Sequence, residues 1–185
     1  MAEALPAGAV LLLDEAYVDF ARESCLDLVE AHPNLVIGRT FAKAQGLAAV
    51  RAGCLAGHAE TIAKVRPFLP PYSVNVFART AMVAALADTE YLEWYRAEVA
   101  ESRRLLYATC DRLGLHYWPS EANFVLVRIG DRASALVGDM AARGVAIRDR
   151  SSQPGCAGCI RFTTGVVEHT QRGLALMEEL LCAAR

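Results

Sequence analysis

The amino-acid sequence predicts an α/β fold followed by a compact α+β unit. Two short, continuous apolar runs, at residues 10–13 and 35–38, are separated by a crossover segment, which is typical of strands buried on both faces of a parallel sheet. After a long helical pattern at residues 89–113, strand-like and helix-like segments alternate to the end of the chain. The 185 residues suffice for one large domain or two small ones. We predict two domains, residues 1–88 and 89–185.

The first of these domains contains the two apolar runs and a series of shorter segments bounded by Gly and Pro. Asp14 directly follows the first run, so it is expected at the carboxyl end of a strand, where open α/β sheets bind ligands. Asn75 begins an alanine-rich segment with helical periodicity. The further elements expected are a short helix at 24–31, a small-residue strand at 52–57, a helix at 58–66, an irregular Pro-rich connector at 67–73 and a helix at 75–87.

The second domain begins with the long helix, whose apolar residues recur every three or four positions and which ends at Gly114. The segments after this helix are shorter, and their apolar residues follow the strand pattern in some and the helix pattern in others. They predict strands at 123–129, 145–148 and 159–163, helices at 132–143 and 168–184, and a loop at 151–158.

Composition excludes several classes of function. The chain is 54% hydrophobic and 22% charged with a net charge of −2, so it lacks the basic surface that binds nucleic acid or anionic membranes. No apolar run approaches the ~20 residues of a membrane span, and the opening does not resemble a signal peptide. We therefore expect a cytoplasmic protein. Six cysteines are too few for a disulfide scaffold. Cys156 and Cys159 form a CxxC, which we interpret as an ordinary loop in preference to a metal or redox site. No metal site is predicted.

A few side chains lie where an α/β enzyme would use them. Taken singly, each has an ordinary interpretation as a cap, a surface amine or half of an ion pair. Together they match what pyridoxal 5′-phosphate requires, namely an amine for a Schiff base, a carboxylate for its ring nitrogen, a donor to its ring oxygen and cations for its phosphate. These residues are Asp14, Tyr17, Thr40, Lys43, Arg51 and Arg161.

The segments that carry these residues resemble a known family. DEAYVDF, followed by NLVIGRTFAKAQGLAAVRAG, is similar to the second half of fold type I pyridoxal-phosphate aminotransferases, and most similar to the histidinol-phosphate aminotransferase branch. SEANFVLV, RGVAIRD and IRFTTGVVEHTQRGLALMEEL resemble the small domain of that branch. The resemblance implies the C-terminal part of this fold, with a partial large domain built on a mainly parallel sheet and an α+β small domain.

The resemblance also implies roles for residues of the first domain. Lys43 would be the Schiff-base lysine and the base that moves the proton between substrate and cofactor. Asp14 would pair with the pyridinium nitrogen, and Tyr17 would donate to the ring oxygen. Thr40 and Arg51 would hold the phosphate, the arginine through a charge-assisted fork.

In the second domain, Arg161 would bind the carboxylate of the amino-group donor, and Asn123 would lie on the substrate side. The family implies transfer of an amino group between small amino and keto acids, here of the histidinol-phosphate and glutamate type with 2-oxoglutarate as acceptor, by a homodimer in histidine biosynthesis. It also implies that an amino-terminal region supplies further parts of the site. Two alternatives stay open: a related decarboxylase acting on a phosphorylated amino acid, and a non-catalytic remnant or interaction module.

Overall fold

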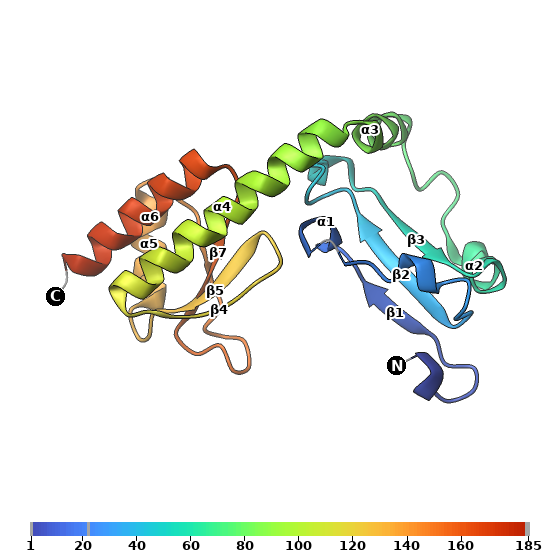
Figure 1. Ribbon diagram of the computed structural model, residues 1–185, viewed down its shortest axis with the longest axis horizontal. Helices are drawn as coiled ribbons and strands as arrows, with labels where there is room; N and C mark the ends of the chain where they lie inside the picture. Colours follow the sequence, from blue (N-terminus) through green and yellow to red (C-terminus); the bar gives the residue numbers. More distant parts are fainter. Residues whose placement is uncertain (1, 22, 184–185) are drawn as a thin grey trace. The chain divides into compact units, whose positions relative to one another are not determined.

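The chain forms two compact units, Met1–Leu92 and Glu93–Arg185, in a computed structural model that describes residues 2–21 and 23–183. The division falls inside α4 (Thr89–Leu113), the helix that the sequence predicts with these bounds (Figure 1). The division therefore lies four residues beyond the predicted boundary between residues 88 and 89. The assignment of the two units to a large and a small domain stays a prediction.

The first unit is built on a three-stranded sheet of β1 (Leu11–Asp14), β2 (Leu35–Thr40) and β3 (Gly53–Gly57) in the order β1-β2-β3 (Figure 1). β1 and β2 are parallel, whereas β2 and β3 are antiparallel. The sheet is therefore mixed, and the expectation of a mainly parallel sheet holds only for the β1–β2 pair. The connection at residues 41–52 contains the short turn η3 (Ala48–Val50) but no crossover α-helix, and such a return allows an antiparallel neighbour.

β1 is not buried on both faces, which corrects the sequence-based expectation. Its residues alternate between half-buried and exposed, and the Leu12 side is open, with 62% of that residue exposed. Leu11 and Leu13 instead pack on a buried cluster that includes Leu35 and Ile37 of β2. Alternation of this kind belongs to a sheet covered on one face, and a continuous apolar run cannot reveal which face is covered.

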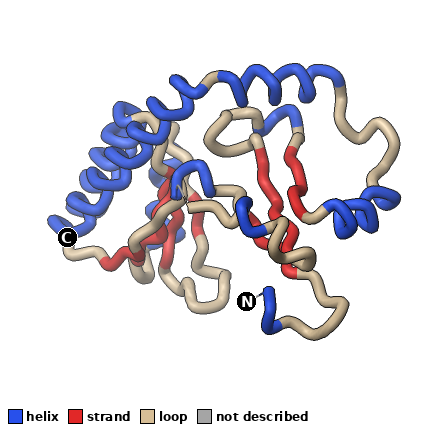
Figure 2. The backbone as a smooth tube through the Cα atoms, turned by 45° about the vertical axis from the view of Figure 1, so that its right-hand side comes forward, coloured by secondary structure: helices blue, strands red, loops and turns tan. Residues whose placement is uncertain are grey.

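Short helices and turns connect the strands of the first unit. The predicted helix at 24–31 is wrong, because only one 3₁₀ turn forms there. The Cys25 and Leu26 amides donate to the side chains of Glu15 and Ser24, so they do not start a helical ladder. The irregular connector predicted at 67–73 begins with the end of η4 (Arg66–Phe68) and continues as a loop up to α3 (Figure 2). The remaining elements are η1 (Ala2–Ala4), α1 (Val18–Ala21), η2 (Leu26–Leu28), η3 (Ala48–Val50), α2 (Ala59–Val65), η4 (Arg66–Phe68) and α3 (Val76–Ala87).

The second unit is a four-stranded antiparallel sheet in the order β4-β5-β7-β6, with helices α4, α5 and α6 on one face (Figure 1). Alternate residues of β5 and β7, among them Val125, Val127, Ile160 and Phe162, form one buried cluster with side chains of the three helices. The opposite face of these strands therefore carries the residues between them. The elements are β4 (His116–Trp118), β5 (Phe124–Arg128), α5 (Ala133–Ala142), β6 (Arg148–Asp149), β7 (Cys159–Thr163) and α6 (Val167–Cys182).

Two strands of this sheet differ from the sequence-based expectation. β4 was not predicted, because three residues with alternating exposure give too short a pattern to recognise. The predicted strand at 145–148 is reduced to a bridge at Arg148–Asp149. The Val145 amide donates to the Met140 carbonyl at 2.9 Å, which closes the end of α5 and keeps that residue out of the sheet.

Residues 151–158 form a series of turns, as predicted, and include Cys156 of the CxxC, whereas Cys159 begins β7. The Cys159 amide donates to the Cys156 carbonyl at 2.9 Å, and all six cysteines are free. Within residues 2–21 and 23–183, no three His, Cys, Asp or Glu side chains group as ligands of a metal ion would. No helix in that same part of the chain combines the length and apolarity needed to cross a membrane.

Candidate functional site

An open hollow of about 1000 Å³ lies along one face of the first sheet. Asp14, Thr40 and Arg51, all predicted from the sequence as cofactor residues, line it together. Its apolar lining includes Leu12 and Leu55. The structure thus brings a carboxylate, a hydroxyl and a guanidinium to one cavity, but it does not by itself assign their roles.

Strand pairing explains why two of these side chains meet. Asp14 is opposite Gly38 in the parallel pair, and Thr40 follows two residues after Gly38, so both side chains lie on the same face. Gly53 lies opposite Thr40, where a Cβ would stand 2.6 Å from the Arg39 carbonyl oxygen. Only glycine allows β3 to approach β2 so closely beside the hollow.

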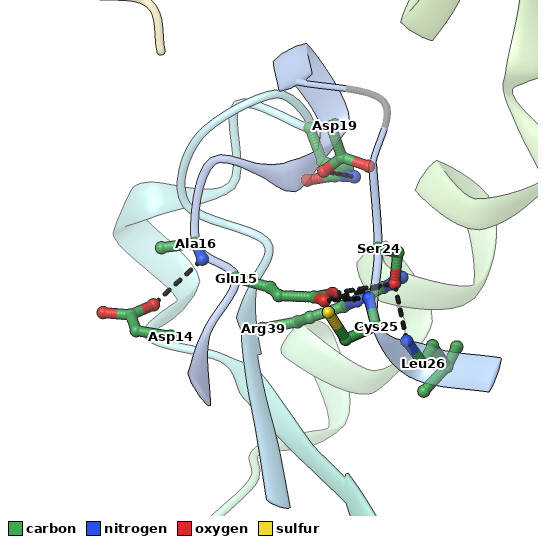
Figure 3. Close-up of polar contacts among 9 residues, drawn as sticks. Asp14, Glu15, Ala16, Asp19, Ser24, Cys25, Leu26 and Arg39 are labelled. Carbon is green, nitrogen blue, oxygen red and sulfur yellow. Dashed lines mark hydrogen bonds and ion pairs between the residues drawn. The ribbon is translucent and has the colours of Figure 1, made fainter. Parts of the chain in front are cut away.

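Local hydrogen bonds hold the Asp14 and Thr40 side chains. Asp14 Oδ1 accepts the Ala16 amide at 2.9 Å, which closes a turn directly after β1 (Figure 3). Thr40 Oγ1 accepts the Ala42 amide at 3.1 Å. Each residue thereby organises the backbone that leaves its own strand, as short polar side chains commonly do in turns.

Lys43 lies next to Tyr17. Its Nζ is 5.2 Å from the centroid of the tyrosine ring, within the range of a cation–π contact. A hydrogen bond links the loop that carries the lysine to α1, because Gln45 Nε2 donates to Asp19 Oδ2 at 2.9 Å. Two predicted site residues from separate segments are thus neighbours, although neither belongs to the lining of the hollow described above.

Arg51 adopts a left-handed backbone conformation with φ of 55°, which costs a non-glycine residue about 1 kcal/mol. Its Nη1 donates to the Ala48 carbonyl at 3.0 Å, so the guanidinium folds back over η3. The residue is exposed. This conformation turns the chain from the lysine loop into β3 and leaves the arginine at the rim of the hollow.

In the second unit, Arg161 lies on β7 on the face away from the helices. Its guanidinium carbon is 5.1 Å from the Phe124 ring centroid. Its Nε is buried and has no hydrogen-bond partner in the described part of the chain. An unpaired buried donor is costly, so an acceptor from a ligand would relieve it. Asn123 lies just before β5, where its carbonyl accepts the Thr164 amide at 2.8 Å.

The sequence reasoning missed Arg148, which lies directly opposite Arg161 in the β6–β7 pair. Side chains of directly opposed residues project from the same face, and like charges there are destabilising. Neither arginine forms an ion pair among the described residues. We hypothesise that an anionic ligand lies between them. Only the pairing register reveals this arrangement, because 13 residues separate the two positions.

The structure is that of an α/β protein whose first sheet carries a mainly apolar hollow along one face, with Asp14, at the carboxyl end of β1, and Thr40 and Arg51 in its lining. The sequence model of the family described as aminotransferase class I and II matches residues 1–175. The chain belongs to the class I and II aminotransferase family.

Individual relatives agree with this assignment. The chain is 41% identical over 176 residues to histidinol-phosphate aminotransferase of Roseiflexus castenholzii, covering 92% of this chain and 47% of that protein. It is 38% identical over 182 residues to the Symbiobacterium thermophilum enzyme of the same name, covering 97% and 50%. The crystal structure of histidinol-phosphate aminotransferase from Sinorhizobium meliloti in complex with pyridoxal-5′-phosphate matches with a TM-score of 0.87 at 31% identity, covering 100% of this chain and 52% of that one. The chain spans about half the length of these relatives.

Proposed function

We propose that the chain carries the lysine-bearing part of a pyridoxal-phosphate-dependent aminotransferase of the histidinol-phosphate and glutamate type, acting in histidine biosynthesis. The single observation that supports this best is the pairing of Lys43 with Tyr17 at 5.2 Å, in the same unit of the chain as a hollow lined by Asp14, Thr40 and Arg51. The names of the relatives supply the substrate type. Because the chain spans about half of their length, a further region of the enzyme completes the site in this proposal.

The side chains present fit the cofactor by their chemistry. The amine, carboxylate, phenol, hydroxyl and guanidinium required for its aldehyde, ring nitrogen, ring oxygen and phosphate occur in one unit of the chain. When bound, pyridoxal phosphate supplies an electrophilic carbonyl and a ring that withdraws electrons from the substrate carbon.

The chain's own residues then have separate tasks. Lys43 Nζ would supply the amine for the cofactor's aldehyde and would accept and return the proton of the substrate carbon. The Asp14 carboxylate would favour a protonated ring nitrogen, because opposite charges at close range stabilise each other. The Tyr17 phenol would donate a hydrogen bond to the ring oxygen. Thr40 and Arg51 would hold the phosphate, and Arg161 would hold a substrate carboxylate by a two-pronged, charge-assisted contact.

The lysine assignment can be tested sharply because the chain has only two lysines, Lys43 and Lys64. Adding pyridoxal phosphate should produce a new visible absorbance band, and borohydride reduction followed by peptide mass mapping should place the adduct on Lys43. Lys43→Ala should abolish the band. Lys64→Ala, which alters an exposed residue of α2, should leave it unchanged.

Labelling of Lys64 or of the amino terminus to the same extent as Lys43 would contradict the assignment. A chain that shows no band would contradict cofactor binding by these residues. Transfer of the glutamate amino group to the bound cofactor, followed as 2-oxoglutarate formation, tests the reaction type. Release of carbon dioxide from a phosphorylated amino acid would favour the decarboxylase alternative.

We also propose that the protein is a homodimer located in the cytoplasm. The exposed apolar side chains of the first unit, among them Leu12 and Phe77, support association with a second copy. Six free cysteines fit a reducing compartment. Light scattering at several protein concentrations would show a monomer if the dimer proposal were wrong.

A further inference from the structure

An ion pair between Glu15, which is buried, and Arg39, which is half-buried, joins the ends of β1 and β2. Arg39 also belongs to the lining of the hollow. Glu15 directly follows Asp14, and Arg39 directly precedes Thr40. The Glu15 side chain is 6% exposed and that of Arg39 31%. Sequence reasoning did not single out either residue, since each is a single charged residue beside a more familiar motif position.

The pair is the centre of a dense set of hydrogen bonds (Figure 3). Arg39 donates to Glu15 Oε2 through Nε at 3.0 Å and approaches it through Nη2 at 2.9 Å. The Ser24 hydroxyl donates to the same oxygen at 3.0 Å, and the Cys25 amide donates to Oε1 at 2.7 Å. Arg39 Nη2 also donates to Ser24 Oγ at 2.6 Å. Both carboxylate oxygens of the glutamate are therefore occupied.

The alternation of side chains along a strand links this network to the hollow. Glu15 and Arg39 project to the core face, while their neighbours Asp14 and Thr40 project to the hollow. Figure 3 shows Asp14 on one side of the chain and Glu15 with Arg39 on the other. The Glu15 amide donates to the Gly38 carbonyl at 2.8 Å, so the backbone pairing continues to this point. A shift of either strand end would move a site residue with it.

The charges of the pair depend on each other. Burial by itself raises the pKa of Glu15, but the Cys25 amide, Arg39 and Ser24 together hold that pKa below its ordinary value. Losing one partner of a buried pair leaves the other charge uncompensated. The hydrogen-bonded ion pair therefore forms only when both Glu15 and Arg39 are present and charged.

We propose that Glu15 and Arg39 are positioning residues, which fix the ends of β1 and β2 so that Asp14 and Thr40 keep the spacing needed to hold the ring nitrogen and the phosphate of the cofactor. The first part concerns this chain alone, and the second rests on the proposed function. In this proposal the pair acts through its neighbours. Glu15 is outside the lining of the hollow, whereas Arg39 belongs to it, so Glu15→Gln is the variant that separates positioning from direct contact.

The first test needs no cofactor and uses amide hydrogen exchange along β1. Arg39→Lys, which keeps the charge but loses the fork, and Glu15→Gln should reduce the protection of the amide at position 15 at least tenfold. The Leu11 amide, which donates to Asn34 at the other end of the strand, should change less than twofold. Leu35→Ala is the matched control, because Leu35 is buried and lies opposite Leu11. It should give the reverse pattern. If Glu15→Gln fails to fold, the milder Arg39→Lys variant decides the test.

The second test measures the dissociation constant of pyridoxal phosphate by absorbance titration. The two charge-pair variants should bind at least tenfold more weakly, whereas Leu35→Ala, compared at an equal loss of Tm, should bind less than twofold more weakly. Equal weakening in all three would show that the pair acts through general stability and would overturn the proposal. Unchanged protection at position 15 would overturn it as well. A wild-type chain without cofactor binding would instead overturn the proposed function and, with it, the cofactor part of this inference.

Discussion

Several residues determine the geometry of the site through their effect on the backbone. Some allow two strands to approach closely, and others form hydrogen bonds that hold a turn. Gly53 permits the close approach of β3 to β2, and the left-handed Arg51 turns the chain into β3. Asp14 and Thr40 are each fastened by a hydrogen bond to the following turn. The geometry beside the hollow therefore depends on single backbone positions whose importance can be tested one at a time.

Gly53→Ala should destabilise the first unit by about 1–3 kcal/mol, the usual cost of forcing extra volume into a packed position. The new Cβ would stand 2.6 Å from a backbone oxygen, which cannot move aside as a flexible side chain could. Gly138→Ala is the matched control, since no heavy atom lies within 4 Å of its added Cβ in α5. That variant should be stabilised by about 0.5–1 kcal/mol. Urea unfolding of both variants measures the difference, and equal effects would contradict the close approach.

Asp149 should contribute to the acid sensitivity of the second unit. Hydrogen bonds from the Ser134 hydroxyl and the Ser151 amide lower its pKa from 3.8 to about 2. Because the folded-state pKa lies below the unfolded one, this contribution is complete above pH ~4 and is lost as the pH falls toward ~2. Asp149→Asn should therefore reduce the loss of unfolding free energy over that interval.

Urea unfolding at a series of pH values measures this slope. Ser134→Ala should reduce the slope only in part, because the hydrogen bond from the Ser151 amide to Asp149 is kept in that variant. The ion-paired Glu178 and Glu179, whose pKa values are also lowered by Arg112 and Arg143, should preserve the remaining slope in both variants. An Asp149→Asn protein with the slope of the wild type would contradict the assignment.

At the scale of elements, the two faces of each sheet differ in what their side chains contact. In each sheet, one face packs on buried apolar residues. The other face of the first sheet lines the hollow, and that of the second carries Arg148 and Arg161. The register between strands decides which charges become neighbours, and in β6–β7 it opposes two arginines.

Arg148→Gln should raise the free energy of unfolding of the ligand-free chain by about 0.2–1 kcal/mol, because it removes a like-charge pair across the strands. Added inorganic phosphate should stabilise the wild type more than the variant if an anion lies between the arginines. Arg128→Gln serves as the control on the same face. Its guanidinium carbon is 5.5 Å from the Trp118 ring centroid, so its loss should destabilise. Thermal unfolding with and without phosphate measures these effects. A ligand-free Arg148→Gln protein that is less stable than the wild type would contradict the prediction.

For the whole molecule, the described chain leaves a large amount of apolar surface uncovered. In the first unit, Leu12, Phe68, Val74 and Phe77 are each more than half exposed, and β1 is an edge strand of its sheet within the described residues. Exposed edges and apolar patches favour association with another chain. This surface is the physical basis of the proposed dimer.

The chain alone should therefore self-associate in a concentration-dependent manner. Leu12→Lys, which places a charge on the exposed side of the edge strand, should shift the molar mass measured by light scattering toward the monomer. Ala63→Lys adds the same charge at an exposed position of α2 and should leave the association unchanged. A monomeric wild type, or equal effects of both variants, would contradict an interface at this face.

Local patterns in the amino-acid sequence were enough to predict the fold class, the long helix α4, most strands and helices, and the family. These follow from local patterns, such as the 3.6-residue period of α4 or the motif around Lys43, which a linear chain displays directly. The roles of Lys43, Asp14, Tyr17, Thr40, Arg51, Arg161 and Asn123 remain predictions that the experiments above address.

The sequence did not reveal which faces of the sheets are covered or which charged side chains are neighbours, and these features came from the three-dimensional structure. It showed that β1 is open on the Leu12 side, that β3 runs antiparallel, and that residues 24–31 do not form the expected helix. It also paired Glu15 with Arg39 and opposed Arg148 to Arg161. In each case, strand register and the turns between strands bring residues together that are distant in the sequence. The local periodicity of the sequence does not specify either of them.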